Sequence, residues 1–133
     1  MFYNVKKYLE KEVSERKIIT FGGAFSNHIA AAAALGNEFG IKTLGVIRGN
    51  ELEDSWQENP TLFSAHQNGM SFRFVTRETY RYKERLMAEL QEEFPESLVV
   101  PEGGTNENAV EGIQYMLTDE TKDFDYICSA VGT

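Results

Sequence analysis

Short apolar segments alternate along this chain with longer segments in which apolar residues recur every three or four positions. The short segments are rich in β-branched and aromatic residues, which is typical of strands, and the longer ones have the spacing of amphipathic helices. Predicted strands cover residues 17–21, 42–48, 70–76, 97–100 and 125–131, and predicted helices cover residues 5–16, 27–39, 60–69, 77–94 and 106–117. This alternation, with short connections, predicts an α/β fold with three layers and a mainly parallel sheet.

Two segments carry specific expectations. Residues 125–131 are almost wholly apolar, which is typical of a strand buried on both faces of a sheet. Cys128 lies inside this segment and is expected to be a small buried hydrophobic residue rather than a nucleophile. The charged run from Arg77 to Arg85 is interpreted as the solvated face of a helix.

Composition narrows the class of protein. The 133 residues suffice for a single domain, and the net charge of −8 argues against nucleic-acid or membrane binding, since both depend on dense positive charge. The one cysteine cannot form an internal disulfide, and no charged-then-apolar leader is present. No apolar run approaches the roughly 20 residues that span a bilayer. We therefore expect a cytoplasmic protein.

The segment Gly22-Gly23-Ala24-Phe25-Ser26-Asn27-His28 joins a predicted strand to a predicted helix. Glycine lets a ligand approach the backbone closely, and Ser26 or Asn27 can cap a helix whose first N–H groups are free. A helix start with a hydroxyl, an amide and an imidazole suits a carboxylate or a phosphate. The alternative is an ordinary strand, turn and capped helix without a ligand.

Other chemistries find less support in the sequence. A serine hydrolase elbow would need a glycine two residues after Ser26, and none stands there. Neither a dinucleotide fingerprint nor a Gly-x-x-x-x-Gly-Lys-Ser/Thr loop is present. His28 and His66 have no spacing that favours a shared metal, so no metal site is predicted.

Three motifs together resemble one enzyme family. Residues 22–28, the segment Pro101-Glu102-Gly103-Gly104-Thr105-Asn106 and the segment Ala130-Val131-Gly132-Thr133 are similar to motifs of the 1-aminocyclopropane-1-carboxylate deaminase and D-cysteine desulfhydrase family. The resemblance runs from about Tyr3 to the end of the chain. It implies a small domain of the tryptophan synthase β-like fold, the cofactor pyridoxal phosphate, and elimination or ring-opening deamination of a small amino acid.

The resemblance also implies roles for individual residues. Ser26 would bind the substrate carboxylate and assist proton movements, Asn27 would hydrogen-bond the phenolic oxygen of the cofactor, and His28 would help to bind the carboxylate. The turn Gly103-Gly104-Thr105 would border the substrate pocket, with an ordinary glycine turn capped by Asn106 as the alternative. Gly132 and Thr133 would begin a phosphate-binding loop.

The chain departs from the family pattern at both ends. At the C-terminal end, Gly132 and Thr133 match only the first residues of the family's glycine-rich phosphate loop. The family's cofactor lysine precedes the first helix, upstream of the residues that match Tyr3 and Asn4, and Lys6 and Lys7 are interpreted as surface positions. Residues 1–133 are thus expected to form one domain that is partial relative to the family, holds no cofactor and is inactive alone.

Two readings of the chain remain. It is either a piece of such an enzyme, whose partner is a small amino acid, or a non-catalytic α/β module that binds small anions or oligomerises. Because the family's large domain would cover residues 125–131, an uncovered apolar segment there predicts a homo-oligomer.

Overall fold

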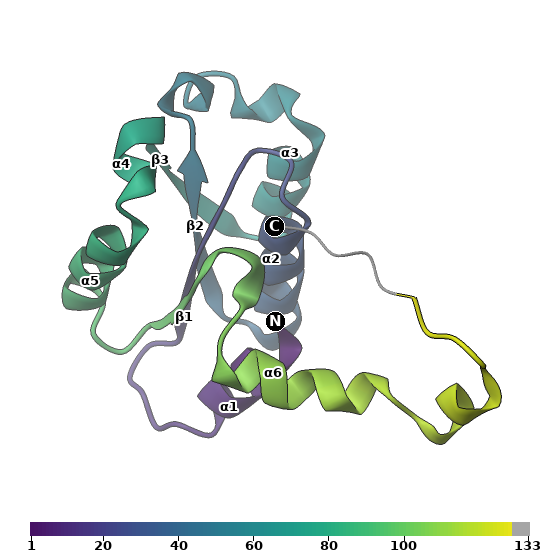
Figure 1. The fold of residues 1–133 in the computed structure, drawn as a ribbon. Helices are drawn as coiled ribbons and strands as arrows, with labels where there is room; N and C mark the ends of the chain where they lie inside the picture. Colours follow the sequence, from purple (N-terminus) through teal and green to yellow (C-terminus); the bar gives the residue numbers. More distant parts are fainter. Residues whose placement is uncertain (129–133) are drawn as a thin grey trace.

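A computed structural model describes residues 1–128 of the chain (Figure 1). Its core is a four-stranded sheet in the order β3-β2-β1-β4, in which every neighbouring pair is parallel. The predicted α/β class and the parallel strands are therefore confirmed. The strands are β1 (Lys17–Gly22), β2 (Lys42–Arg48), β3 (Met70–Val75) and β4 (Leu98–Val100). The helices are α1 (Phe2–Leu9), α2 (Asn27–Phe39), α3 (Pro60–Gln67), α4 (Arg77–Arg81), α5 (Lys83–Glu93) and α6 (Glu107–Ile113).

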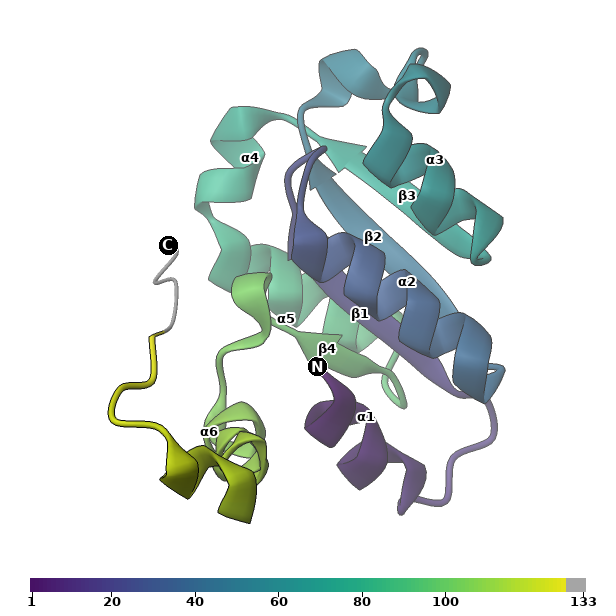
Figure 2. The same ribbon diagram turned by 90° about the vertical axis from the view of Figure 1, so that its right-hand side faces the viewer.

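Helices cover both faces of the sheet, which gives the three expected layers (Figures 1 and 2). Successive residues of a strand point to opposite faces, so the buried Ile18 and Ile19 of β1 belong to different clusters. Ile18 packs with Val5 of α1, whereas Ile19 packs with Leu90 of α5. Ile47 of β2 lies in a third cluster with side chains of α2 and α3. The central strands are thus apolar on both sides, as parallel sheets require.

Helix α2 follows directly from its sequence. The Ser26 hydroxyl caps it by accepting a hydrogen bond from the Ile29 N–H at 3.4 Å, and Gly40 ends it in the left-handed conformation with φ of 62°. Gly36 is required for packing, because a Cβ there would lie 2.2 Å from Cγ2 of Thr43 on β2. The helix therefore sits close to the sheet and is fixed at its start.

Several boundaries differ from the predictions. Helix α1 ends at Leu9 rather than near residue 16, and the helix expected over residues 77–94 is interrupted at Tyr82, whose φ of −96° and ψ of 45° are not helical. Helix α6 ends at Ile113 and continues as a short 3₁₀ turn. The changes in α1 and α6 concern helix ends, where local sequence signals are weakest, whereas the break at Tyr82 divides the predicted helix in its interior.

The expectation of a buried final strand is wrong for residues 125–128. They form no strand, and Tyr126 and Ile127 are 88% and 63% exposed. Cys128 is exposed as well, so it is not the buried hydrophobic residue that the sequence predicts. An apolar segment becomes a buried strand only where it meets a sheet edge and a covering layer, and the chain after α6 leads away from the strands in both views (Figures 1 and 2). Residues 129–131 of that prediction lie outside the described residues.

Among residues 1–128, no helix combines the length and the apolar character needed to cross a bilayer.

Candidate functional site

The carboxyl ends of the parallel strands bring two distant motifs together. The segment from Gly22 to His28 follows β1, and the turn from Glu102 to Gly104 follows β4. Because β1 and β4 are paired, with Thr20 opposite Val100, both loops leave the sheet at the same edge. This edge is where open parallel sheets bind their ligands.

The buried hydroxyl of Thr20 in β1 contacts the imidazole of His28. Thr20 is fully buried, and its Oγ1 lies 2.6 Å from Nε2 of His28. The same hydroxyl donates to the carbonyl of Val100 at 3.0 Å. Burial, and then the charge of the chain's amino terminus, lower the pKa of His28, against a smaller opposing effect of Glu102. His28 is thus a positioned and largely neutral imidazole at neutral pH.

The glycine turn after β4 lies against this imidazole. Gly103 and Gly104 both have φ of 74°, in the left-handed region that favours glycine. A Cβ on Gly104 would lie 3.0 Å from Cε1 of His28, so only glycine lets the turn approach the ring this closely. Asn106 caps α6 by accepting a hydrogen bond from the Ala109 N–H at 2.9 Å, which the alternative of an ordinary glycine turn also predicts. The turn in addition contacts His28 in the first turn of α2, and Thr105, the next residue, is exposed.

The start of α2 presents free donors. Asn27 and His28 are its first two residues, so their N–H groups have no acceptor within the helix. Within residues 1–128 these two N–H groups have no other acceptor either. The Asn27 side chain is exposed, and Ser26 is half-buried with its hydroxyl used as the cap. The two N–H groups and the Asn27 amide are available to an oxyanion.

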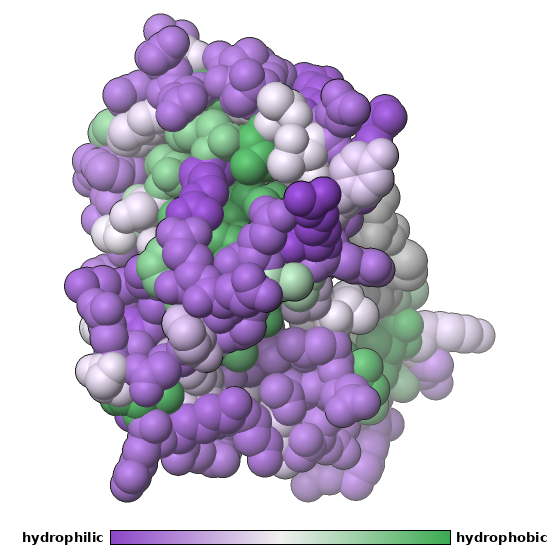
Figure 3. Space-filling model, turned by 90° about the vertical axis from the view of Figure 1, so that its left-hand side faces the viewer, coloured by the Kyte–Doolittle hydropathy of each residue, from purple (hydrophilic) through white to green (hydrophobic). Residues whose placement is uncertain are grey.

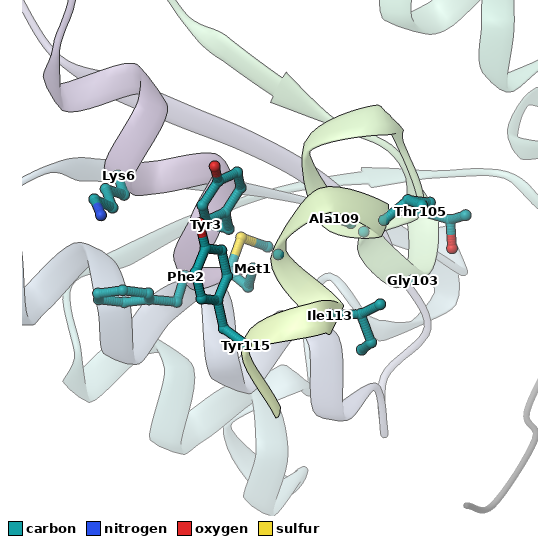
Figure 4. A pocket seen from close by; sticks show the side chains of 12 residues that line it. Met1, Phe2, Tyr3, Lys6, Gly103, Thr105, Ala109, Ile113 and Tyr115 are labelled. Atoms are coloured by element: carbon teal, nitrogen blue, oxygen red, sulfur yellow. The ribbon is translucent and has the colours of Figure 1, made fainter. Parts of the chain in front are cut away.

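A cavity of about 760 Å³ lies between α1 and α6 and reaches the same glycine turn (Figure 4). Tyr3 and Tyr115 form one wall, with ring centroids 5.7 Å apart. The Tyr3 hydroxyl donates to Glu111, and this hydrogen bond raises the pKa of Tyr3. Gly112 allows the contact between the helices, because a Cβ there would lie 2.6 Å from the Tyr3 Cβ. The cavity is lined by Met1, Phe2, Tyr3, Lys6, Gly103, Gly104, Thr105, Ala109, Val110, Gly112, Ile113 and Tyr115.

The structure brings some of the predicted site residues together and leaves others apart. His28 and Gly104 are in contact, and Gly103, Gly104 and Thr105 line the cavity between α1 and α6. Ser26 and Asn27 lie at the start of α2 and are not among the residues that line it. Gly132 and Thr133 lie outside the described residues.

The described residues fit pyridoxal phosphate only in part. The exposed Asn27 amide suits a ring oxygen, and the free N–H groups suit a carboxylate. Lys6 lines the cavity but is exposed, and the Lys7 ammonium lies 5.6 Å from the Tyr3 ring centroid. Neither amine is buried as a cofactor-bearing lysine would be, so neither is placed to hold the cofactor.

Sequence reasoning missed Thr20 and Tyr3. A hydroxyl within an otherwise apolar, buried strand is the signal that marks Thr20, because a buried polar group needs a partner. Tyr3 carries no such signal, since its role depends on the packing of α1 against α6.

Comparison with known proteins supports the fold. No family model matches the sequence, and no curated protein matches it. A solved crystal structure described as an ACC deaminase homologue matches with a TM-score of 0.60 and 24% sequence identity. The match covers 83% of this chain and 33% of the other, so the chain spans about one third of that protein. The two share a fold.

Proposed function

We propose that the chain forms the cofactor-facing small domain of a pyridoxal-phosphate-dependent deaminase or desulfhydrase that acts on a small amino acid. The contact between His28 and Gly104 carries the proposal, because it joins two of the three family-like motifs at the ligand-binding edge of the sheet. The shared fold with an ACC deaminase homologue supports it.

In this proposal each residue of the first motif has a defined task. The N–H groups of Asn27 and His28 donate to the substrate carboxylate, and the Ser26 hydroxyl lies beside them. Thr20 orients the His28 ring through its hydroxyl. The Asn27 amide would donate to the cofactor's ring oxygen, and Gly132 and Thr133 would belong to its phosphate loop. Pyridoxal phosphate, when bound, supplies the electron sink for negative charge at the substrate carbon.

An amide titration tests the carboxylate site. Adding 1-aminocyclopropane-1-carboxylate to the ¹⁵N-labelled protein is expected to shift the Asn27 and His28 amide signals, with roughly millimolar affinity because the site is open. Cyclopropylamine, which lacks the carboxylate, serves as the control and should shift neither signal. Shifts caused equally by both compounds, or none at all, would contradict the assignment.

A trapping experiment tests the cofactor. Treating the 133-residue chain with pyridoxal phosphate and then borohydride is expected to give no stoichiometric lysine adduct, because Lys6 and Lys7 are not held as a cofactor-bearing amine. A single modified peptide that contains Lys6 or Lys7 would show the opposite. A longer protein that carries an in-frame Asn-Lys-x-Arg-Lys segment upstream is expected to give one adduct there.

The second candidate is a non-catalytic module that binds small anions. The free N–H groups at the start of α2 favour it equally. The two candidates differ in the trapping experiment on the longer protein, because only the enzyme forms an adduct there.

A further inference from the structure

A second cavity of about 680 Å³ lies at the carboxyl ends of β1, β2 and β3 and is bordered by the loop that follows β1. We call it the basic cavity, and it is lined by Gly23, Ala24, Phe25, Arg48, Glu51, Leu52, Arg77, Tyr80, Arg81 and Lys83. Four of these ten residues carry a cationic side chain and one carries a carboxylate. The cavity is thus locally positive, although the net charge of the chain is −8.

Topology explains why these cations meet. Arg48 is the last residue of β2, and Arg77 and Arg81 lie on α4, which directly follows β3. Lys83 begins α5. The charged run from Arg77 to Arg85 is largely exposed, as the sequence predicts, and the break at Tyr82 lets α4 and the start of α5 line the same cavity as Arg48. The side of the molecule that carries α4 and α5 is largely hydrophilic (Figure 3).

Two of the cations form ion pairs with carboxylates of the chain, and two do not. Arg77 pairs with Glu51 at 2.8 Å, and Lys83 pairs with Glu102 at 2.6 Å. In the part of the chain that the structure describes, no carboxylate lies within ion-pair distance of Arg48 or Arg81. Among residues 1–128, the cavity therefore holds two positive charges without a directly paired carboxylate.

The Tyr80 ring forms a rigid wall of the cavity. It is only 3% exposed, and its ring packs against Phe21 of β1 at a centroid distance of 6.4 Å. The Arg48 guanidinium and the Lys83 ammonium each lie 5.5 Å from the centre of this ring. Contacts of this kind hold cations over an aromatic face, so the Tyr80 ring helps to position Arg48 and Lys83 while both remain accessible to solvent.

The loop that follows β1 packs closely against Arg48. A Cβ on Gly23 would lie 3.4 Å from Nη2 of Arg48, which places the loop backbone directly beside the guanidinium. A small ligand seated there would contact both the arginine fork and the loop.

We propose that the basic cavity binds a small oxyanion with two negative charges, either a phosphate group or a dicarboxylate, through Arg48 and Arg81. Arginine suits both, because its planar fork donates two parallel hydrogen bonds to a carboxylate or a phosphate. The inference is independent of the proposed function, since it uses neither the α2 N–H groups nor the cofactor.

Two anion titrations at constant ionic strength test the proposal, one with inorganic phosphate and one with succinate, each followed by the amide signals of residues 23–25 and 48. Saturable shifts with either probe are expected, and the probe that binds identifies the phosphate or the dicarboxylate chemistry. Raising the salt concentration should weaken the binding, because the cations are exposed. The absence of saturable shifts with both probes would overturn the proposal.

Matched charge variants locate the site. Arg48→Gln and Arg81→Gln are each expected to weaken binding about tenfold, as the loss of a charge-assisted hydrogen bond does. Arg85→Gln removes the same charge from an exposed side chain that pairs with Glu89 at 2.9 Å and does not line the cavity, so it should leave the affinity nearly unchanged. Equal weakening in all three variants would show attraction to overall charge rather than a site, and unchanged affinity in both cavity variants would also overturn the proposal. Thermal unfolding of each variant confirms that it is folded.

Discussion

Oγ1 of Thr20 lies 2.6 Å from Nε2 of His28, and this contact joins the buried interior of β1 to the first turn of α2. Because the Thr20 hydroxyl gives its proton to the Val100 carbonyl at 3.0 Å, its oxygen has to accept from the imidazole. His28 is therefore protonated at Nε2, and when neutral it carries its lone pair on Nδ1, toward the Gly104 turn. One hydroxyl thus fixes both the position and the tautomer of the imidazole.

The first prediction concerns this hydroxyl. Thr20→Val keeps the shape of the side chain and removes the hydroxyl that bonds both the Val100 carbonyl and the His28 Nε2–H, so it should lower the free energy of unfolding by about 1 to 3 kcal/mol. Nitrogen NMR shifts of the imidazole should show Nε2 protonated in the parent protein. Thr20→Ser, which keeps the hydroxyl, should preserve that tautomer. An imidazole protonated at Nδ1 in the parent would contradict the arrangement.

A pH dependence follows from the same residue. Burial lowers the pKa of His28 in the folded protein below the unfolded value of about 6.5, so below that pH the unfolded chain binds more protons. The contribution of His28 to stability is therefore complete above about pH 6.5 and declines as the pH falls. Urea unfolding between pH 7 and 5 should show this decline, and His28→Gln should reduce it. His66→Gln, which removes an exposed imidazole, is the control and should retain the decline.

Adjacent glycines allow a matched test of the turn. Gly103 and Gly104 share φ of 74°, so replacing either by alanine costs about 1 kcal/mol for the left-handed backbone. Only at Gly104 would the new Cβ also press on the His28 ring, at 3.0 Å. Gly104→Ala should therefore lower the unfolding free energy by roughly 1 to 3 kcal/mol more than Gly103→Ala. Gly104→Ala should also shift the NMR signals of the His28 ring. If both variants lower the unfolding free energy equally and leave those signals alike, the turn and the imidazole are not in contact.

The layers of this fold could be predicted from the sequence because they depend on local patterns. Residues 42–48 are rich in apolar and β-branched residues, which favours a strand, and Ser26 and Gly40 mark the ends of α2 chemically. The contact of His28 with Gly104 could not be predicted from local patterns without the family resemblance. It depends on the pairing of β1 with β4, and the two residues are 76 positions apart in the chain. The interruption at Tyr82 was also missed, because nothing in its neighbours' helical spacing disfavours a continuous helix.

Asn4 offers a prediction about stability. Its side chain is fully buried, and within residues 1–128 neither its nitrogen nor its oxygen has a hydrogen-bond partner. A buried amide without partners is destabilising, so Asn4→Leu should raise the free energy of unfolding by about 1 kcal/mol. Thr43→Val, which removes another buried hydroxyl without a partner, should also stabilise. Lower stability in the Asn4→Leu protein would show that the amide has a partner, such as a bound water.

The last prediction is self-association. Beyond α6 the described chain exposes large apolar side chains, including Leu117, Phe124, Tyr126 and Ile127, each of them more than half accessible. Exposed apolar groups that follow one another in this way favour burial against a second copy, most simply with twofold symmetry. Light scattering over a concentration series should show the mass rising from 15.1 kDa toward twice that value.

A double variant separates this surface from general stickiness. Tyr126→Ser combined with Ile127→Ser removes the two apolar side chains at the end of the described chain and should hold the protein near the monomer mass. Phe63→Ser changes a 45% exposed aromatic residue on α3, away from that surface, and should leave the concentration dependence intact. A constant monomer mass of the parent protein would show that no association takes place. A double variant that associates as the parent does would show that another surface supplies the free energy of association.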